Sequence, residues 1–143
     1  MSKHLAEVAN LQNIFLNKSQ FELFESDVIK GSSLTISTKL EHKFAGDKEN
    51  SSLNCKYGTS IKGVSPEKET IFSLDVEFVA IYSLNEILDW DDDEIHMFMD
   101  KCVNLHVWPF LREHVHSISS KTNIPTVMLP LLPSGHKKKE SDD

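Results

Sequence analysis

Residues 70–84, TIFSLDVEFVAIYSL, alternate between apolar and polar side chains over most of their length. The apolar residues of one side are Phe72, Leu74, Val76, Phe78, Tyr82 and Leu84. The other side begins with Ser73, Asp75 and Glu77 and ends with Val79 and Ile81. Alternation with period two predicts an antiparallel strand that packs one face and leaves the other in water. We therefore expect the chain to fold around a sheet.

Two earlier segments, 34–44 and 53–62, repeat this alternation. A polar stretch at 46–50 separates them, and a break at 63–69 that contains Pro66 precedes the strand described above. Three strands joined by short polar turns predict an antiparallel meander.

The N-terminal part of the chain is less regular. Ser2–Asn17 places apolar residues at helical spacing but has no clear cap, so it predicts either a frayed helix or an irregular lead-in. Phe21–Phe24 can form a short fourth strand. Ser26–Ser33 suggests a crossover loop, because Gly31 follows two apolar residues without a tight-turn pattern.

The second half of the chain is predicted to be helical. Acidic residues gather at 89–94, directly before an apolar stripe that runs from Ile95 to Leu105. Carboxylates at a helix N-terminus cap free N–H groups and complement the helix dipole. Pro109 is expected to interrupt the helix, and a second stripe then starts at Trp108. We predict an α+β fold in which a four-stranded antiparallel sheet is followed by a long kinked helix.

Length and charge limit the class of protein. The chain has 143 residues, which suits a single domain over residues 1–133 with a disordered charged tail at 134–143. Its net charge of −7 and pI of about 5.4 argue against a nucleic-acid partner. No run approaches the roughly 20 apolar residues that cross a bilayer. Cys55 and Cys102 are expected to be free thiols in a reducing cytoplasm.

The sequence gives no positive reason to expect an enzyme. It lacks the GxxxxGK phosphate loop and the GxSxG nucleophile elbow. His96, His106, His114 and His116 share the helical half with Cys102, but they lack the paired spacing of zinc ligands. We predict no catalytic residue, no metal and no cofactor, and binding is the default function.

The order of elements and several motifs resemble SecB, the bacterial protein-export chaperone, and its SecB-like relatives. The matching segments are Ile14–Glu22, Thr70–Leu84, Cys102 with Asn104, Pro109-Phe110 with Arg112-Glu113, and Pro125 with Leu129-Pro130. The resemblance implies a SecB-like homotetramer, a dimer of dimers, that binds unfolded precursor proteins for export without ATP. It places substrate in an apolar groove near Phe24, Val28, Ile29 and Ile81.

The resemblance also suggests which residues join the subunits. Leu74, Val76 and Phe78 match positions of an assembly-related face in the family, although an ordinary core role is equally compatible with them. Trp108, Leu111 and Val115 add to an apolar surface larger than one small sheet can cover, so we expect these six residues at the oligomer interface.

Two features depart from the family pattern. Glu22 and Asp75 match acidic positions that dock the translocation motor SecA, but Lys18 replaces an expected acid and Ser73 an expected apolar residue. The second helix that flanks the groove in typical SecB is missing after Pro133, so we expect a more open groove. A chaperone dedicated to one client, such as an antitoxin of a toxin–antitoxin module, therefore stays an alternative to an export chaperone. A scaffold protein without chaperone activity is a second alternative.

Overall fold

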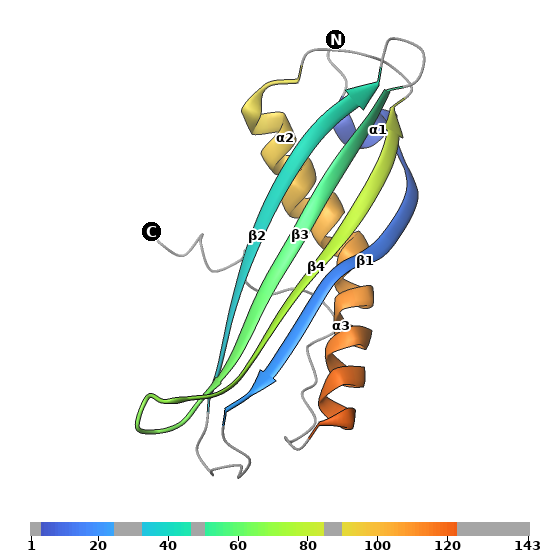
Figure 1. Ribbon diagram of the computed structural model, residues 1–143. Helices are drawn as coiled ribbons and strands as arrows, with labels where there is room; N and C mark the ends of the chain where they lie inside the picture. Colours follow the sequence, from blue (N-terminus) through green and yellow to red (C-terminus); the bar gives the residue numbers. More distant parts are fainter. Residues whose placement is uncertain (1–3, 25–32, 47–50, 85–89, 123–143) are drawn as a thin grey trace.

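The computed structural model describes residues 4–24, 33–46, 51–84 and 90–122. Four long strands and one continuous helical segment over residues 92–121, which we call the helical arm, account for nearly all of them (Figure 1). The elements are α1 (Leu5–Val8), β1 (Ala9–Leu23), β2 (Ser33–Gly46), β3 (Ser51–Val64), β4 (Thr70–Leu84), α2 (Asp92–Phe98), the π-helical segment η1 (Met99–Val103) and α3 (Asn104–Lys121). This architecture confirms the predicted α+β fold of a four-stranded antiparallel sheet followed by a long helix.

The strands form one antiparallel sheet in the order β1-β4-β3-β2. The three strands of the predicted meander are present, and β4 has the predicted bounds, Thr70–Leu84. The N-terminal part contains the expected helix only as one turn, α1, and the expected fourth strand is much longer than predicted, because β1 runs over 15 residues from Ala9 to Leu23. Its pairing with β4 contains two register shifts, after Leu11 and after Leu16. Such bulges bend an edge strand and break its alternation.

The helical arm begins at Asp91, whose side chain accepts a hydrogen bond from the Glu94 backbone N–H at 2.8 Å. This confirms the expected role of the acidic cluster as a helix cap. The predicted interruption at Pro109 was wrong, because α3 continues through this residue. Proline removes a hydrogen bond to the carbonyl four residues earlier, here Leu105. Leu105 is half exposed, so water can satisfy that carbonyl.

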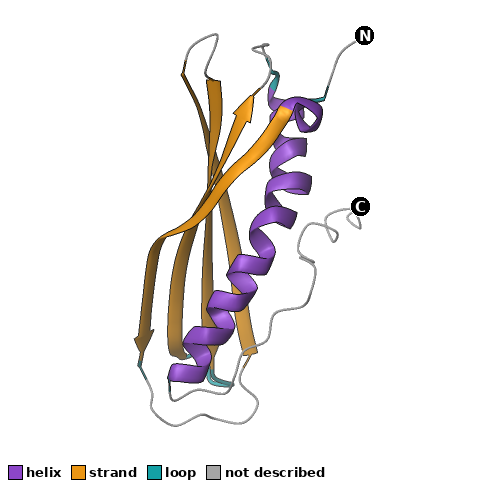
Figure 2. Ribbon diagram, turned by 90° about the vertical axis from the view of Figure 1, so that its right-hand side faces the viewer, coloured by secondary structure: helices purple, strands orange, loops and turns teal. Residues whose placement is uncertain are grey.

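The helical arm lies against one face of the sheet, which we call the inner face (Figure 2). Leu53, Tyr57 and Ile61 of β3 and the even-numbered residues of β4 from Phe72 to Tyr82 point into this interface and are buried. The opposite, outer face carries Asp75 and Lys56, both exposed. The core thus lies over the two central strands.

The six residues predicted at the oligomer interface belong to this core. Their side chains are almost completely buried within the single chain: Leu74 3%, Val76 3%, Phe78 5%, Trp108 6%, Leu111 1% and Val115 2% exposed. The sheet and the helix bury each other at these positions, Leu74, Val76 and Phe78 on β4 and Trp108, Leu111 and Val115 on α3, so an excess of apolar surface there does not support a tetramer. A second subunit would have to contact other side chains.

The helical arm crosses the inner face diagonally. Figure 1 shows α2 on the side of β2 and α3 ending on the side of β1. The α3 end is tied to β1 by a hydrogen bond of 2.8 Å between Ser19 Oγ and His114 Nε2. A diagonal helix covers the central strands along their length but leaves parts of both edge strands bare.

Candidate functional site

An exposed apolar surface lies on the inner face of β2. We call it the β2 stripe, and it consists of Leu34, Ile36, Leu40 and Phe44. Leu34 is 46% exposed, Ile36 42% and Phe44 39%. Their partners across the β2–β3 ladder, Ile61 for Ile36 and Leu53 for Phe44, are fully buried. The stripe is therefore a lateral extension of the core in which Leu34, Ile36 and Phe44 are left exposed by the described chain, while Leu40 is partly buried against the core.

The free edge of β2 lies directly beside this stripe. Ser33 to Gly46 pairs residue by residue with β3, without a register shift. Among the described strands, none pairs with the other side of β2. A long, regular edge strand presents free N–H and C=O groups that can pair with another extended chain.

A hollow of about 460 Å³ separates the middle of β2 from the helical arm. Leu40 and His42 form its β2 side, and Met97 and Met99 are among the residues that face them from α2 and η1. Asp93, His96, Asp100 and Lys101 complete the lining. Met97 is 47% exposed, and methionine adapts its shape to varied apolar partners. The β2 stripe, the free edge and this hollow together form a surface suited to an extended apolar segment.

Of the residues predicted to line the groove, the two that the structure describes, Phe24 and Ile81, do not come together. Phe24 follows the end of β1, where its N–H donates to the Ile71 carbonyl, on the opposite edge of the sheet from β2. Ile81 faces the outer side near the other end of β4, opposite Asn13 and Asn54. Val28 and Ile29 lie outside the described residues. The alternation at 34–44 predicts the strand β2, but it does not predict that the apolar side of this strand is exposed.

A second exposed apolar surface lies where β1 meets α3. We call it the β1 patch, made of Leu11, Leu16 and Phe110, which are 41%, 44% and 47% exposed. Leu16 pairs with Phe78, and the Phe78 ring lies 6.4 Å from that of Phe110. The patch thus joins an edge strand and a helix, whereas the β2 stripe belongs to a strand alone.

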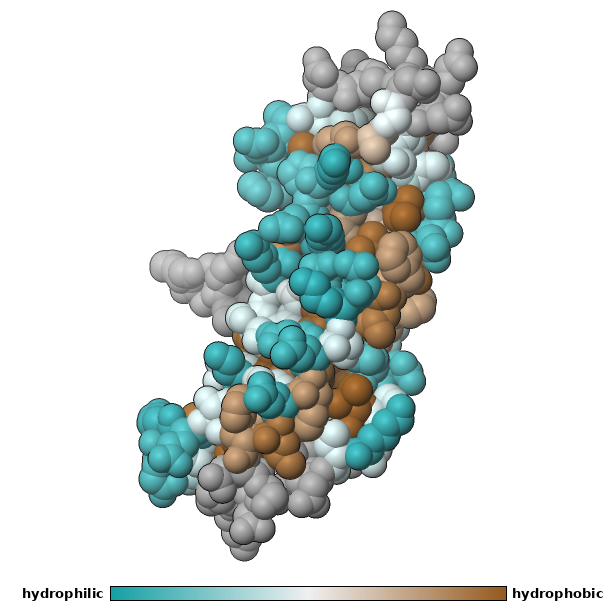
Figure 3. All heavy atoms as spheres, viewed as in Figure 1, coloured by the Kyte–Doolittle hydropathy of each residue, from teal (hydrophilic) through white to brown (hydrophobic). Residues whose placement is uncertain are grey.

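The outer face of the sheet is divided by charge. The basic half is formed by Lys39 and Lys43 of β2 with Lys56 and Lys62 of β3. On the other half, Glu22 and Lys18 of β1 and Asp75 of β4 are exposed, and Glu77 beside them is half-buried. Figure 3 views this side and shows hydrophilic side chains over much of it, with hydrophobic ones gathered toward β1. The structure brings the two predicted docking residues together, but it sets them beside lysines.

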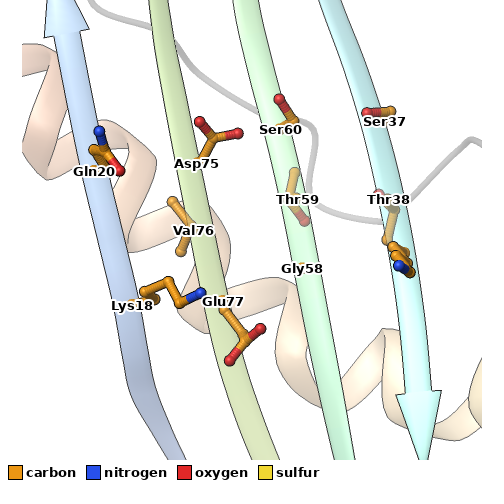
Figure 4. A pocket seen from close by; sticks show the side chains of 11 residues that line it. Lys18, Gln20, Ser37, Thr38, Gly58, Thr59, Ser60, Asp75, Val76 and Glu77 are labelled. Carbon is orange, nitrogen blue, oxygen red and sulfur yellow. The ribbon is translucent and has the colours of Figure 1, made fainter.

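A shallow hollow opens over Gly58 in the middle of this face (Figure 4). Gly58 creates the space, because a Cβ there would meet only the Lys39 carbonyl oxygen at 3.7 Å. Lys18, Asp75 and Glu77 surround the hollow, so charges of both signs alternate around its rim. These side chains stand on flat strands and do not converge on one point, and we assign them no ligand.

The buried polar groups join the helix to the sheet. The Tyr57 hydroxyl donates to Asn104 Oδ1, and the Tyr82 hydroxyl lies 2.8 Å from His106 Nδ1. Burial raises the pKa of Tyr57 to about 12 and that of the Cys55 thiol to about 12, so both groups stay neutral at pH 7. A thiol held in this form is a poor nucleophile. These groups stabilise the fold.

The described ranges lack two further kinds of site. No group of three His, Cys, Asp or Glu side chains there could hold a metal ion. No helix in the same part of the chain is long and apolar enough to span a membrane.

Comparison with solved structures identifies the fold. The structure matches Mycobacterium tuberculosis Rv1957, a SecB-like chaperone, in its complex with a ChAD peptide from the Rv1956 HigA1 antitoxin. The TM-score is 0.73, and the match covers 92% of this chain and 95% of that one at 17% sequence identity. No family model matches the sequence, and no curated protein does. The chain therefore has a SecB-like fold.

Proposed function

We propose that this protein is an ATP-independent holdase chaperone that binds unfolded polypeptide segments along β2. The observation that carries the proposal is the β2 stripe beside an unbulged edge with which no other described strand pairs. An unfolded chain exposes apolar side chains and free backbone groups. The stripe can pack against the side chains and the β2 edge can hydrogen-bond to the backbone, and neither interaction requires a particular client sequence. We propose no catalytic activity and a cytoplasmic location.

The binding energy available is sufficient for a transient holdase. Burial of about 500 Å² of apolar surface would contribute on the order of 12 kcal/mol before the costs of ordering the client and the lost freedom of association. A net affinity near the micromolar range needs only about 8 kcal/mol. Weak, reversible capture at each site fits a protein that must release its client unaided.

Light scattering from an aggregating client tests the proposal. A chemically denatured protein is diluted into buffer without nucleotide, and equimolar chaperone is expected to suppress the scattering. Phe44→Asp in the β2 stripe should abolish the suppression. Phe15→Asp is the matched control, because Phe15 is also 39% exposed but lies on the outer side of β1, opposite Val79. A wild-type protein that fails to suppress scattering even in several-fold excess would remove the chaperone assignment.

A dedicated client is the second candidate function. It is supported by the structural neighbour, which was solved with a peptide from an antitoxin. Co-purification from the native cell separates the two possibilities: many precursor proteins would support export, and one dominant partner would support dedication. Docking of SecA at Glu22 and Asp75 belongs to the export alternative, and charge reversal of both residues should then weaken it.

We also propose that copies of the chain associate through the β1 patch, as a homotetramer or as the dimer within it. The patch offers apolar side chains from a strand and a helix, and the edge of β1 is available beside it. This arrangement would leave the β2 stripe of each subunit open to a client.

A further inference from the structure

The outer side chains of β2 adjoin the position that a client strand would take. Residues 35, 37, 39, 41 and 43 point to the outer face, because their neighbours 34, 36, 38, 40 and 42 oppose the inward-facing residues of β3. In antiparallel and parallel sheets alike, side chains alternate between the two faces. A segment added to the edge of β2 would therefore place every second side chain beside this outer row.

The outer row is electropositive at its centre. Lys39 and Lys43 are exposed and flank Glu41 along β2, and Lys56 lies directly opposite Glu41 on β3. Lys39 Nζ is 3.5 Å from Glu41 Oε2. Three lysines thus surround one glutamate, which leaves two positive charges without a negative counterpart in this group.

We propose that β2 selects client segments whose inward side chains are apolar and whose outward side chains opposite Lys39 and Lys43 are acidic, so that these two lysines are the specificity-determining residues. This inference rests on the proposed binding along β2. Residues opposite Lys39 and Lys43 are four positions apart in the client, and both should be Asp or Glu. The residue between them, opposite Glu41, should be neutral or basic. The intervening side chains turn inward and pack on the β2 stripe.

The expected selectivity is moderate. An opposite-charge pair directly across two strands stabilises the pairing by a factor of about two to five, and like charges weaken it similarly. Two such pairs should give about tenfold tighter binding at low salt. The lysines are exposed, so added salt should reduce this difference.

Fluorescence anisotropy with three labelled peptides tests the inference. The peptides share the same alternating apolar residues, and their two outward positions opposite Lys39 and Lys43 are both Glu, both Ser or both Lys. Affinity is expected to fall in that order by about tenfold from Glu to Ser, and the Lys39→Glu/Lys43→Glu variant should reverse the order. Lys18→Glu is the control, because Lys18 lies on the same face but on β1, at the far edge of the sheet.

The outcomes separate the two proposals. Equal affinities for the three peptides, or an unchanged preference in the double variant, would overturn the acidic selectivity and leave the holdase intact. If none of the peptides binds the wild-type protein, the proposed binding along β2 fails, and the selectivity fails with it. Circular dichroism of the double variant should match the wild type, since both lysines are exposed.

Discussion

The two edge strands of this sheet differ in regularity and in their link to the helix. β1 has two bulges, and its Ser19 side chain is hydrogen-bonded to His114 of α3. Both edge strands expose apolar side chains on the inner face, but β2 alone keeps an unbroken register over its whole length. Proteins normally protect a regular, apolar edge because it recruits other strands. An edge left in this state is best explained by a function that uses it.

The contrast can first be tested by stability. Leu111→Ala removes a side chain that is 1% exposed between α3 and the sheet, and we expect it to lower the free energy of unfolding by about 2–5 kcal/mol. Ile36→Ala in the β2 stripe should cost less than about 1 kcal/mol, because Ile36 is already 42% exposed. Urea denaturation measures both values. Similar losses for the two variants would mean that the stripe is part of the core.

Assembly provides the next test. Phe110→Asp places a charge in the β1 patch, and we expect it to weaken subunit association by at least about tenfold, since a buried unpaired charge is costly at an interface. Ile36→Asp on the β2 stripe should leave the molar mass unchanged. Light scattering coupled to gel filtration measures both. Dissociation by Ile36→Asp alone would mean that the β2 side, and not the β1 side, holds the subunits together.

The smallest expected effect concerns the hydrogen bond between Ser19 of β1 and His114 of α3. Burial, with a smaller contribution from Lys121, lowers the pKa of His114 below its usual 6.5, although nearby Glu113 opposes the shift. The unfolded chain therefore binds this proton more readily than the folded one. Stability should fall as the pH drops through 6.5 and level off below the folded pKa.

His114→Gln should flatten this part of the pH profile, because glutamine can keep a hydrogen bond to Ser19 but does not titrate. Thermal melts of both proteins between neutral and mildly acidic pH measure the difference. A steeper profile in the variant would contradict the lowered pKa of His114.

Period-two alternation predicted β2, β3 and β4, because each keeps its register with its neighbour along almost the entire strand. It failed for β1, whose inward residues are Leu11, Ile14, Leu16, Ser19, Phe21 and Leu23. The bulges insert steps of three into a pattern of two, and steps of three imitate the spacing of a helix. Pairing with β4 overrides that local pattern.

The site was harder to predict than the fold. Leu34 and Ile36 have the same alternating pattern as Leu53 and Ile61, which are fully buried. Periodicity identifies the apolar face of a strand, but the path of the helix decides which strands it covers. The path of the helix depends on packing across the whole inner face, so no local sequence motif around β2 predicts it.

The central claim is that β2 takes up an extended client. Hydrogen exchange of the backbone amides, measured with and without the serine peptide described above, tests it most directly. The account predicts slower exchange for amides along β2 and unchanged exchange along β1. Protection that appears on β1, or a bound peptide that leaves β2 unprotected, would contradict it.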